Sequence, residues 1–170
     1  MALLERFSYI DPDGREWVAD AGVTIDGATI PRPLWTLLGS PYTGDYRRAS
    51  IVHDVATDHP DSAGARRAAD RMFFHACRAG GCSLREAIVL YVGVRIGAHL
   101  PQVPAWQGVA LAEREGARLR RSAADDRVEA DFRLAAENIL AAGETGDVRA
   151  IEERTDAALS MAAQVDLRGR

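Results

Sequence analysis

A histidine and an aspartate stand side by side in the stretch "IVHDVATDH", residues 51–59, where both could take part in hydrolysis. The imidazole of His53 can accept a proton from water near neutral pH, and the carboxylate of Asp54 is an oxygen ligand suited to a hard cation. A further carboxylate, Asp70, lies among apolar and aromatic residues in "RRAADRMFFHA". A carboxylate in such surroundings needs a polar partner, because burying it alone costs several kcal/mol. We therefore expect Asp70 to pair with His53.

A helical hairpin would bring His53 and Asp70 together. A helical period begins near Asp45 and is ended by Pro60, and a second helix is predicted from residues 62 to 79. The connection is short, so the two helices should pack antiparallel, and the two residues stand at comparable distances from the bend. In this arrangement Asp70 would fix the imidazole tautomer and His53 would act as a general base.

The same residues also have a structural interpretation. In it His53 and Asp70 form a buried hydrogen bond, and Asp54 is simply exposed. An enzyme would place His53 in an open cleft with Asp26 and Asp54 nearby, whereas a structural network would be sealed and fully hydrogen-bonded. The second case predicts a non-enzymatic interaction module that binds a protein partner or itself through its carboxyl-terminal helices.

Other hydrolytic sites fit the sequence less well. A metal phosphohydrolase of the His-Asp type needs a histidine upstream of the pair, but the four histidines are residues 53, 59, 75 and 99. A serine nucleophile is not indicated, because the chain has no G-x-S-x-G motif.

In the non-enzymatic interaction module, Trp35 and Trp106 are candidate contact residues for the partner, although tryptophans more often belong to the core.

The amino-terminal part is predicted to be extended. In "RFSYIDPDGREWVADAG" apolar residues alternate on both sides of the turn "DPDG", which indicates a β-hairpin. The next segment, "VTIDGATIPRPLWTLLG", has a turn at Asp26-Gly27 and two prolines that exclude a central strand. We expect a compact loop there, which ends in a short helix over "PLWTLL" and precedes the first long helix.

The rest of the chain is predicted to be helical. A third helix begins at the capping box "SLRE" and ends near His99, and the boundary follows at "LPQVP". Helices with one narrow apolar stripe each follow on both sides of "GETGD", and they must pack on the core or on another chain. The predicted fold is mainly α with a small N-terminal β-hairpin (α+β), an antiparallel helical hairpin core and a C-terminal helical extension. We expect a core domain at residues 1–104 and the extension at 105–170.

Composition favours a soluble protein that does not bind nucleic acid. The chain has 170 residues, of which 47% are hydrophobic and 27% charged, and its formal net charge is -4. No run reaches the roughly 18 apolar residues of a membrane span, and no secretory signal is recognisable, so we expect a cytoplasmic location, with a virion or export by another route as alternatives. Cys77 and Cys82 lack the spacing of a zinc site and are interpreted as reduced packing residues.

Three motifs in this order resemble the domain of unknown function 1353 family, small proteins of bacterial and phage genomes. They are "TIDGATIP" with a following tryptophan, "RRASIVHDVATDH" and "RRAADRMFFHACRAGG", and the likeness covers roughly residues 5–100. The family has no established activity, so the resemblance implies a fold group and no reaction. It also implies that the non-enzymatic interaction module would be phage-associated or bacterial. Thr57 departs from the family's usual aromatic residue at that position.

The core is also similar, more distantly, to phospholipase A2, which has a His-Asp pair on one helix and an aspartate on the antiparallel partner. The resemblance implies that His53 is the base and Asp70 its orienting carboxylate. It further implies that Asp54 binds Ca²⁺ with Asp26 beside the loop residues Gly27 and Thr29, and that the substrate is phospholipid or a membrane surface. The disulfides of that family, its glycine-rich calcium loop and its supporting tyrosine are missing here.

Overall fold

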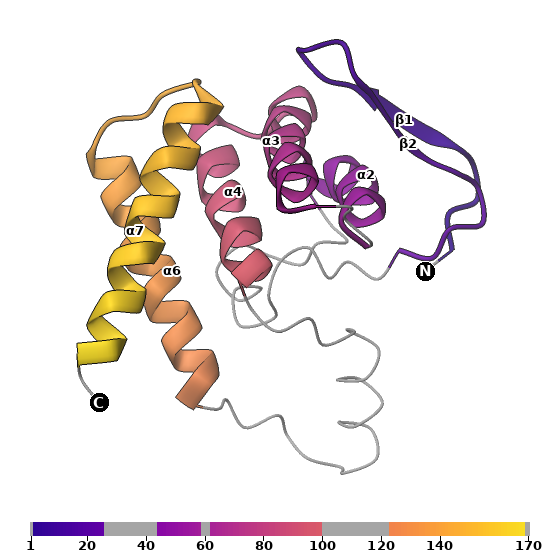
Figure 1. Cartoon of the computed structure of the whole chain (residues 1–170). Helices are drawn as coiled ribbons and strands as arrows, with labels where there is room; N and C mark the ends of the chain where they lie inside the picture. The colour runs from indigo at the N-terminus through magenta and orange to yellow at the C-terminus, as the bar shows by residue number, and fades with distance from the viewer. Residues whose placement is uncertain (1, 26–43, 59–61, 100–122, 169–170) are drawn as a thin grey trace, which may run out of the picture.

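The structure is a computed structural model that describes residues 2–25, 44–58, 62–99 and 123–168. Its elements are the strands β1 (Phe7–Ile10) and β2 (Glu16–Ala19) and the helices α2 (Arg47–Asp58), α3 (Ala63–Ala79), α4 (Leu84–His99), α6 (Ala123–Ala141) and α7 (Val148–Arg168). The mainly helical fold with a small amino-terminal hairpin is thus confirmed. The hairpin lies beside α2. Helix α3 packs on α2, and α4 packs on α3. Helices α6 and α7 pack against α4, on the side of the molecule away from the hairpin (Figure 1).

The strands pair antiparallel, with Tyr9 opposite Trp17. The side chain of Asp11 builds the turn between them, because its Oδ1 accepts hydrogen bonds from the backbone N–H groups of Asp13 at 3.0 Å and Arg15 at 2.9 Å. Its Oδ2 accepts from the indole Nε1 of Trp17 at 2.8 Å. One aspartate therefore fixes the "DPDG" turn predicted from the sequence.

Local sequence signals set the helix ends near the site. The hydroxyl of Ser62 accepts from the N–H of Ala65 at 3.1 Å and caps α3. The predicted capping box of α4 is present: Ser83 N–H donates to Glu86 at 2.7 Å, and Glu86 N–H donates to the Ser83 hydroxyl at 3.2 Å. At the end of α3 the chain passes so close to the Asp45 backbone that a Cβ on Gly80 would lie 2.4 Å from the Asp45 carbonyl oxygen.

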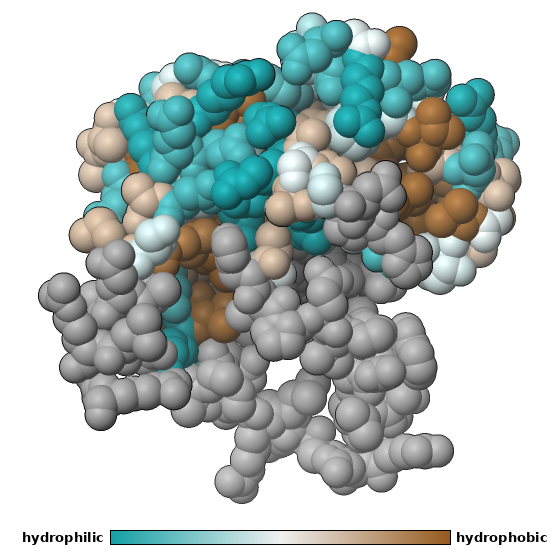
Figure 2. Space-filling model, in the orientation of Figure 1, coloured by the Kyte–Doolittle hydropathy of each residue, from teal (hydrophilic) through white to brown (hydrophobic). Residues whose placement is uncertain are grey.

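The core is centred on α3 and α4, and α6 and α7 complete it. Phe132 and Ile139 of α6 and Ile151 of α7 are buried in the same cluster as Phe73 and Tyr91. The apolar faces of the carboxyl-terminal helices therefore pack on the core of their own chain. Polar side chains cover most of the α3–α7 face, and apolar ones gather beside the hairpin (Figure 2).

Some sequence predictions fall outside the described residues. They concern the loop residues Asp26, Gly27 and Thr29, the short helix over "PLWTLL", and the expected boundary at residue 104. Trp35 and Trp106 belong to the same group. Within the described ranges, no helix is both long enough and apolar enough to cross a bilayer.

Candidate functional site

His53 and Asp70 meet across α2 and α3, as the sequence predicts. The imidazole Nε2 of His53 lies 2.8 Å from Oδ1 of Asp70, and the exposed fraction of each residue is 0%. Nε2 is the donor in this hydrogen bond because an ionised carboxylate only accepts. The imidazole also packs against the ring of Phe73, with 4.9 Å between the ring centroids. The contact follows from the antiparallel packing of two helices whose apolar faces turn towards each other.

Two arginines complete the surroundings of Asp70. Arg66, one turn earlier on α3, places Nε 3.2 Å from Oδ1, and Arg95 on α4 places Nη1 3.0 Å from Oδ2. Both carboxylate oxygens are therefore bonded to groups that donate. Burial by itself would raise the pKa of Asp70, but the hydrogen bonds from His53 and Arg95 and the positive charge of Arg66 outweigh it and hold that pKa below its usual value.

The charged cluster continues from Arg95 to α7. Nη2 of Arg95 lies 2.6 Å from Oδ1 of Asp156, and Oδ2 of Asp156 also pairs with Arg67 of α3. Arg67 and Arg71 each reach Glu152 of α7 at 2.8 Å. Arg95 is 3% exposed. These residues join α2, α3, α4 and α7. We call them the buried network after its buried members His53, Asp70, Arg95 and Glu152, although Arg67, Arg71 and Asp156 are partly exposed. The full set is His53, Arg66, Arg67, Asp70, Arg71, Arg95, Glu152 and Asp156.

Most of the buried network was not predicted from the sequence. Arg95 is the charged residue within the apolar run "IVLYVGVRIGAH" of α4, and that isolation was a usable signal, because a lone charge on a buried helix needs a partner. Arg66 precedes Asp70 by one helical turn and could also have been found. Glu152 and Asp156 gave no comparable signal, because carboxylates are common on exposed helix faces.

The other predicted site residues are not brought together by the described structure. Asp54 is partly buried on α2, and its expected cation partner Asp26 lies outside the described residues. In the described part of the chain, no group of three or more histidine, cysteine, aspartate or glutamate residues is placed to hold a metal ion. Asp54 is thus the one expected Ca²⁺ ligand among the described residues, whereas a Ca²⁺ site needs six to eight oxygens. Because Asp26, Gly27 and Thr29 lie outside the described residues, calcium binding stays a prediction.

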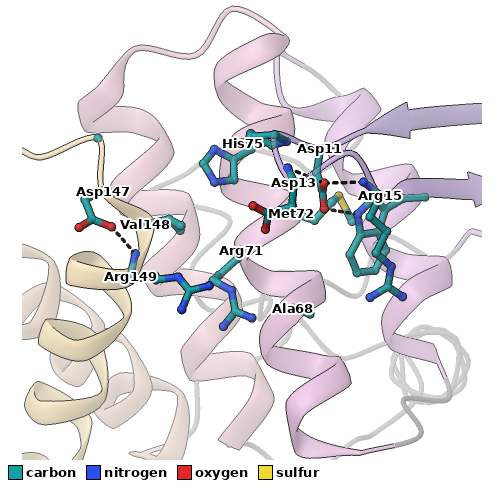
Figure 3. Close-up of a pocket in the computed structure, with 13 residues that line it drawn as sticks. Asp11, Asp13, Arg15, Ala68, Arg71, Met72, His75, Asp147, Val148 and Arg149 are labelled. Atoms are coloured by element: carbon teal, nitrogen blue, oxygen red, sulfur yellow. Dashed lines mark hydrogen bonds between the residues drawn. The ribbon is translucent and has the colours of Figure 1, made fainter.

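A surface cavity of about 360 Å³ lies away from the His53–Asp70 pair. The hairpin turn, α3 and the start of α7 line it, and Figure 3 shows His75 and Asp13 on one side and Arg71 with Arg149 on the other. His75 is half-buried, and burial lowers its pKa although the nearby Asp11 and Asp13 oppose this. No pattern in the sequence indicated this cavity.

Acidification is expected to destabilise the fold through Asp70 and Asp156. Hydrogen bonds from Arg95 and Arg67 outweigh burial and lower the pKa of Asp156 as well. Because both folded pKa values lie below the ordinary 3.8, the unfolded chain binds more protons in acid. Their contribution to stability is present above pH 3.8 and is lost as the pH falls through the folded values. Urea denaturation at a series of pH values down to about pH 2 measures this decline. An equally steep decline in Asp70→Asn would contradict the assignment to Asp70.

Comparison with known proteins gives a family and no activity. The family model described as "Protein of unknown function (DUF1353)" matches residues 1–94. The chain belongs to this family. The match covers α2 and α3, and hence His53 and Asp70. It ends within α4, at the residue before Arg95. Arg95, Glu152 and Asp156 lie beyond the matched residues.

Two curated relatives come from the bacterium Sinorhizobium fredii. "Uncharacterized protein y4jT" is 36% identical over 90 residues, which are 52% of this chain and 26% of the relative. "Uncharacterized protein y4iH" is 31% identical over 88 residues, which are 52% of this chain and 36% of the relative. The chain thus spans a quarter to about a third of these relatives. No solved structure matches the chain. The resemblance to phospholipase A2 gains no support from these comparisons.

Proposed function

We propose that the protein is a non-enzymatic binding module in which the His53–Asp70 pair belongs to an internal brace. The observation that carries this proposal is that both residues are 0% exposed while both oxygens of Asp70 are bonded to His53, Arg66 and Arg95. A general base must come within about 3 Å of the proton that it takes. A sealed imidazole does not meet that condition, whereas a brace requires that the pair is buried and that both carboxylate oxygens are bonded.

The surface cavity is the proposed contact site for a carboxylate of a protein partner. Arg149 has no ion-pair partner among the described residues, and Arg71 uses Nη1 for Glu152. The two guanidinium groups lie together at the start of α7 (Figure 3). Arginine donors match a carboxylate in geometry and charge, so a partner's glutamate or aspartate suits this side of the cavity. Asp13 lies on the opposite side, towards the hairpin.

The lengths of the relatives support a modular role. The matched part occupies 26% of one Sinorhizobium fredii protein and 36% of the other. A unit of this size that occurs with different amounts of additional sequence is typical of a module that contributes binding or structure to a larger chain.

One observation favours a second candidate, a phospholipase A2-like ester hydrolase. The 2.8 Å contact between His53 Nε2 and Asp70 Oδ1 is the contact that such a dyad requires. In this alternative His53 would activate water, Asp70 would orient it, and Asp54 with Asp26 would hold Ca²⁺ near phospholipid.

An assay of phospholipid hydrolysis separates the two candidates. With mixed phospholipid micelles, we expect no release of fatty acid by the wild type above the background of His53→Ala, with or without added Ca²⁺. The reason is that the imidazole is fully buried. Circular dichroism checks that both proteins are folded. Calcium-dependent release by the wild type that disappears in His53→Ala would overturn the binding-module proposal and favour the hydrolase.

A peptide titration tests the cavity. We expect a short N-acetylated, C-amidated peptide with one glutamate to shift the amide NMR resonances of Arg71, His75 and Arg149. Arg149→Gln should weaken this binding about tenfold, because a charge-assisted hydrogen bond contributes about 1.5–3 kcal/mol. The exposed Arg133 of α6 provides the matched variant, Arg133→Gln, which should bind as the wild type does. Equal binding of a peptide with glutamine in place of glutamate would contradict the charge argument.

A further inference from the structure

The turn between α3 and α4 brings the backbones of two cysteines together. Cys82 N–H donates to the Cys77 carbonyl at 3.1 Å, and Gly81 N–H donates to the Arg78 carbonyl at 3.3 Å. This pair of bonds is the Schellman motif, which needs a residue with positive φ, here Gly81 with φ 113°. A contact between the side chains at its two ends commonly accompanies this motif. Those ends are Cys77 and Cys82, both of which belong to the buried core cluster.

The two thiols differ in access. Cys77 is 0% exposed, within the core. Cys82 is 4% exposed, but it lines a second surface cavity of about 400 Å³ together with Tyr46 and Arg85. A small reagent in this cavity would therefore meet Cys82 first, and Cys77 would lie directly behind it.

The pKa values of the two thiols also differ, and the more accessible Cys82 has the lower one. Burial raises the pKa of Cys77 well above its usual value, and the hydrogen bond with Cys82 adds to this. The hydrogen bond from Cys77 lowers the pKa of Cys82, against burial and the nearby carboxylates of Glu86 and Asp45. Since the thiolate is the nucleophile, Cys82 is the more reactive of the two.

We propose that Cys82 is a modification site for hydroperoxides and that Cys77 is its resolving partner. In the first step the Cys82 thiolate attacks one oxygen of hydrogen peroxide, the O–O bond breaks, and, with one proton taken up, Cys82 sulfenic acid and water form. In the second step the Cys77 sulfur attacks the Cys82 sulfur, and the S–O bond breaks. The thiol proton leaves with the hydroxyl group as water. Two electrons pass in total from the thiols to the peroxide, and an intramolecular disulfide remains.

Trypsin allows this proposal to be tested on the wild-type chain. Cleavage after Arg71, Arg78 and Arg85 separates Cys77 and Cys82 into peptides 72–78 and 79–85. After the folded protein is treated with hydrogen peroxide and the remaining thiols are blocked, we expect the two peptides to appear joined, with the intact mass lower by about 2 Da. Separate peptides with both thiols blocked would overturn the proposal, and so would links between different molecules.

Two serine variants assign the roles. In Cys77→Ser, Cys82 should form a sulfenic acid that dimedone traps, because its resolving thiol is absent. In Cys82→Ser, Cys77 should form no dimedone adduct above the level seen without peroxide. Thermal melts followed by circular dichroism check that each variant is folded, and the peptide map of the wild type decides the matter for any variant that is not. Equal trapping at Cys77 and Cys82 would show that the two thiols do not differ in reactivity and would overturn the assignment of roles.

Discussion

Replacement of Asp70 by asparagine is expected to lower the free energy of unfolding by about 3–5 kcal/mol. The change keeps the shape of the side chain but removes the negative charge that pairs with Arg95 at 3.0 Å and Arg66 at 3.2 Å. Arg95 is 3% exposed, so its charge would lose a buried partner that water cannot replace. Equilibrium urea denaturation followed by circular dichroism measures the loss.

An exposed aspartate provides the control for this substitution. Asp20 lies 3.7 Å from Arg6, and their side chains are 76% and 60% exposed. Because exposed ion pairs contribute little, Asp20→Asn should change the free energy of unfolding by less than about 0.5 kcal/mol. If Asp70→Asn were as mild as Asp20→Asn, the buried network would not act as a brace.

Truncation of Ile151 is expected to destabilise the protein by about 2–5 kcal/mol. Ile151 lies on α7, beyond the part of the chain that the family model matches, yet it is 0% exposed and belongs to the common core. Ile151→Ala removes apolar contacts and leaves a cavity that the rigid core refills only in part. The free energy of unfolding in urea again gives the magnitude.

The matched variant for Ile151→Ala is Leu134→Ala on α6. Leu134 is 56% exposed, so its truncation removes little buried surface and should change the free energy of unfolding by less than about 0.5 kcal/mol. A small effect of Ile151→Ala would mean that α7 is an appendage and that residues 1–94 hold the core by themselves. A large effect would make the carboxyl-terminal helices part of the folding unit.

Local features of the fold could be predicted from the sequence because their causes are local. The turn "DPDG" carries the aspartate that bonds its own backbone, and "SLRE" carries both members of a capping box. The helices around the site could be found from apolar residues recurring once per turn. The contact between His53 and Asp70 could also be predicted, because a short connection fixes which turns of two antiparallel helices lie opposite each other.

The role of that contact was not contained in the sequence. Whether a histidine beside an aspartate is a base in a cleft or a buried brace depends on what covers it. The partners Arg95 and Asp156 come from helices whose rotation and height are set by packing of the whole core. The surface cavity likewise combines the hairpin, α3 and α7, which are far apart along the chain.

The sequence by itself therefore determined the elements, the family and the pairing of two residues. Tertiary structure alone decided that the pair is sealed, that Arg66 and Arg95 neutralise Asp70, and that α7 closes the network. The physical reason is the separation along the chain over which each kind of interaction acts. Caps, turns and apolar periodicity act within a few residues, whereas burial and ion pairing depend on side chains that meet only after every helix has been packed.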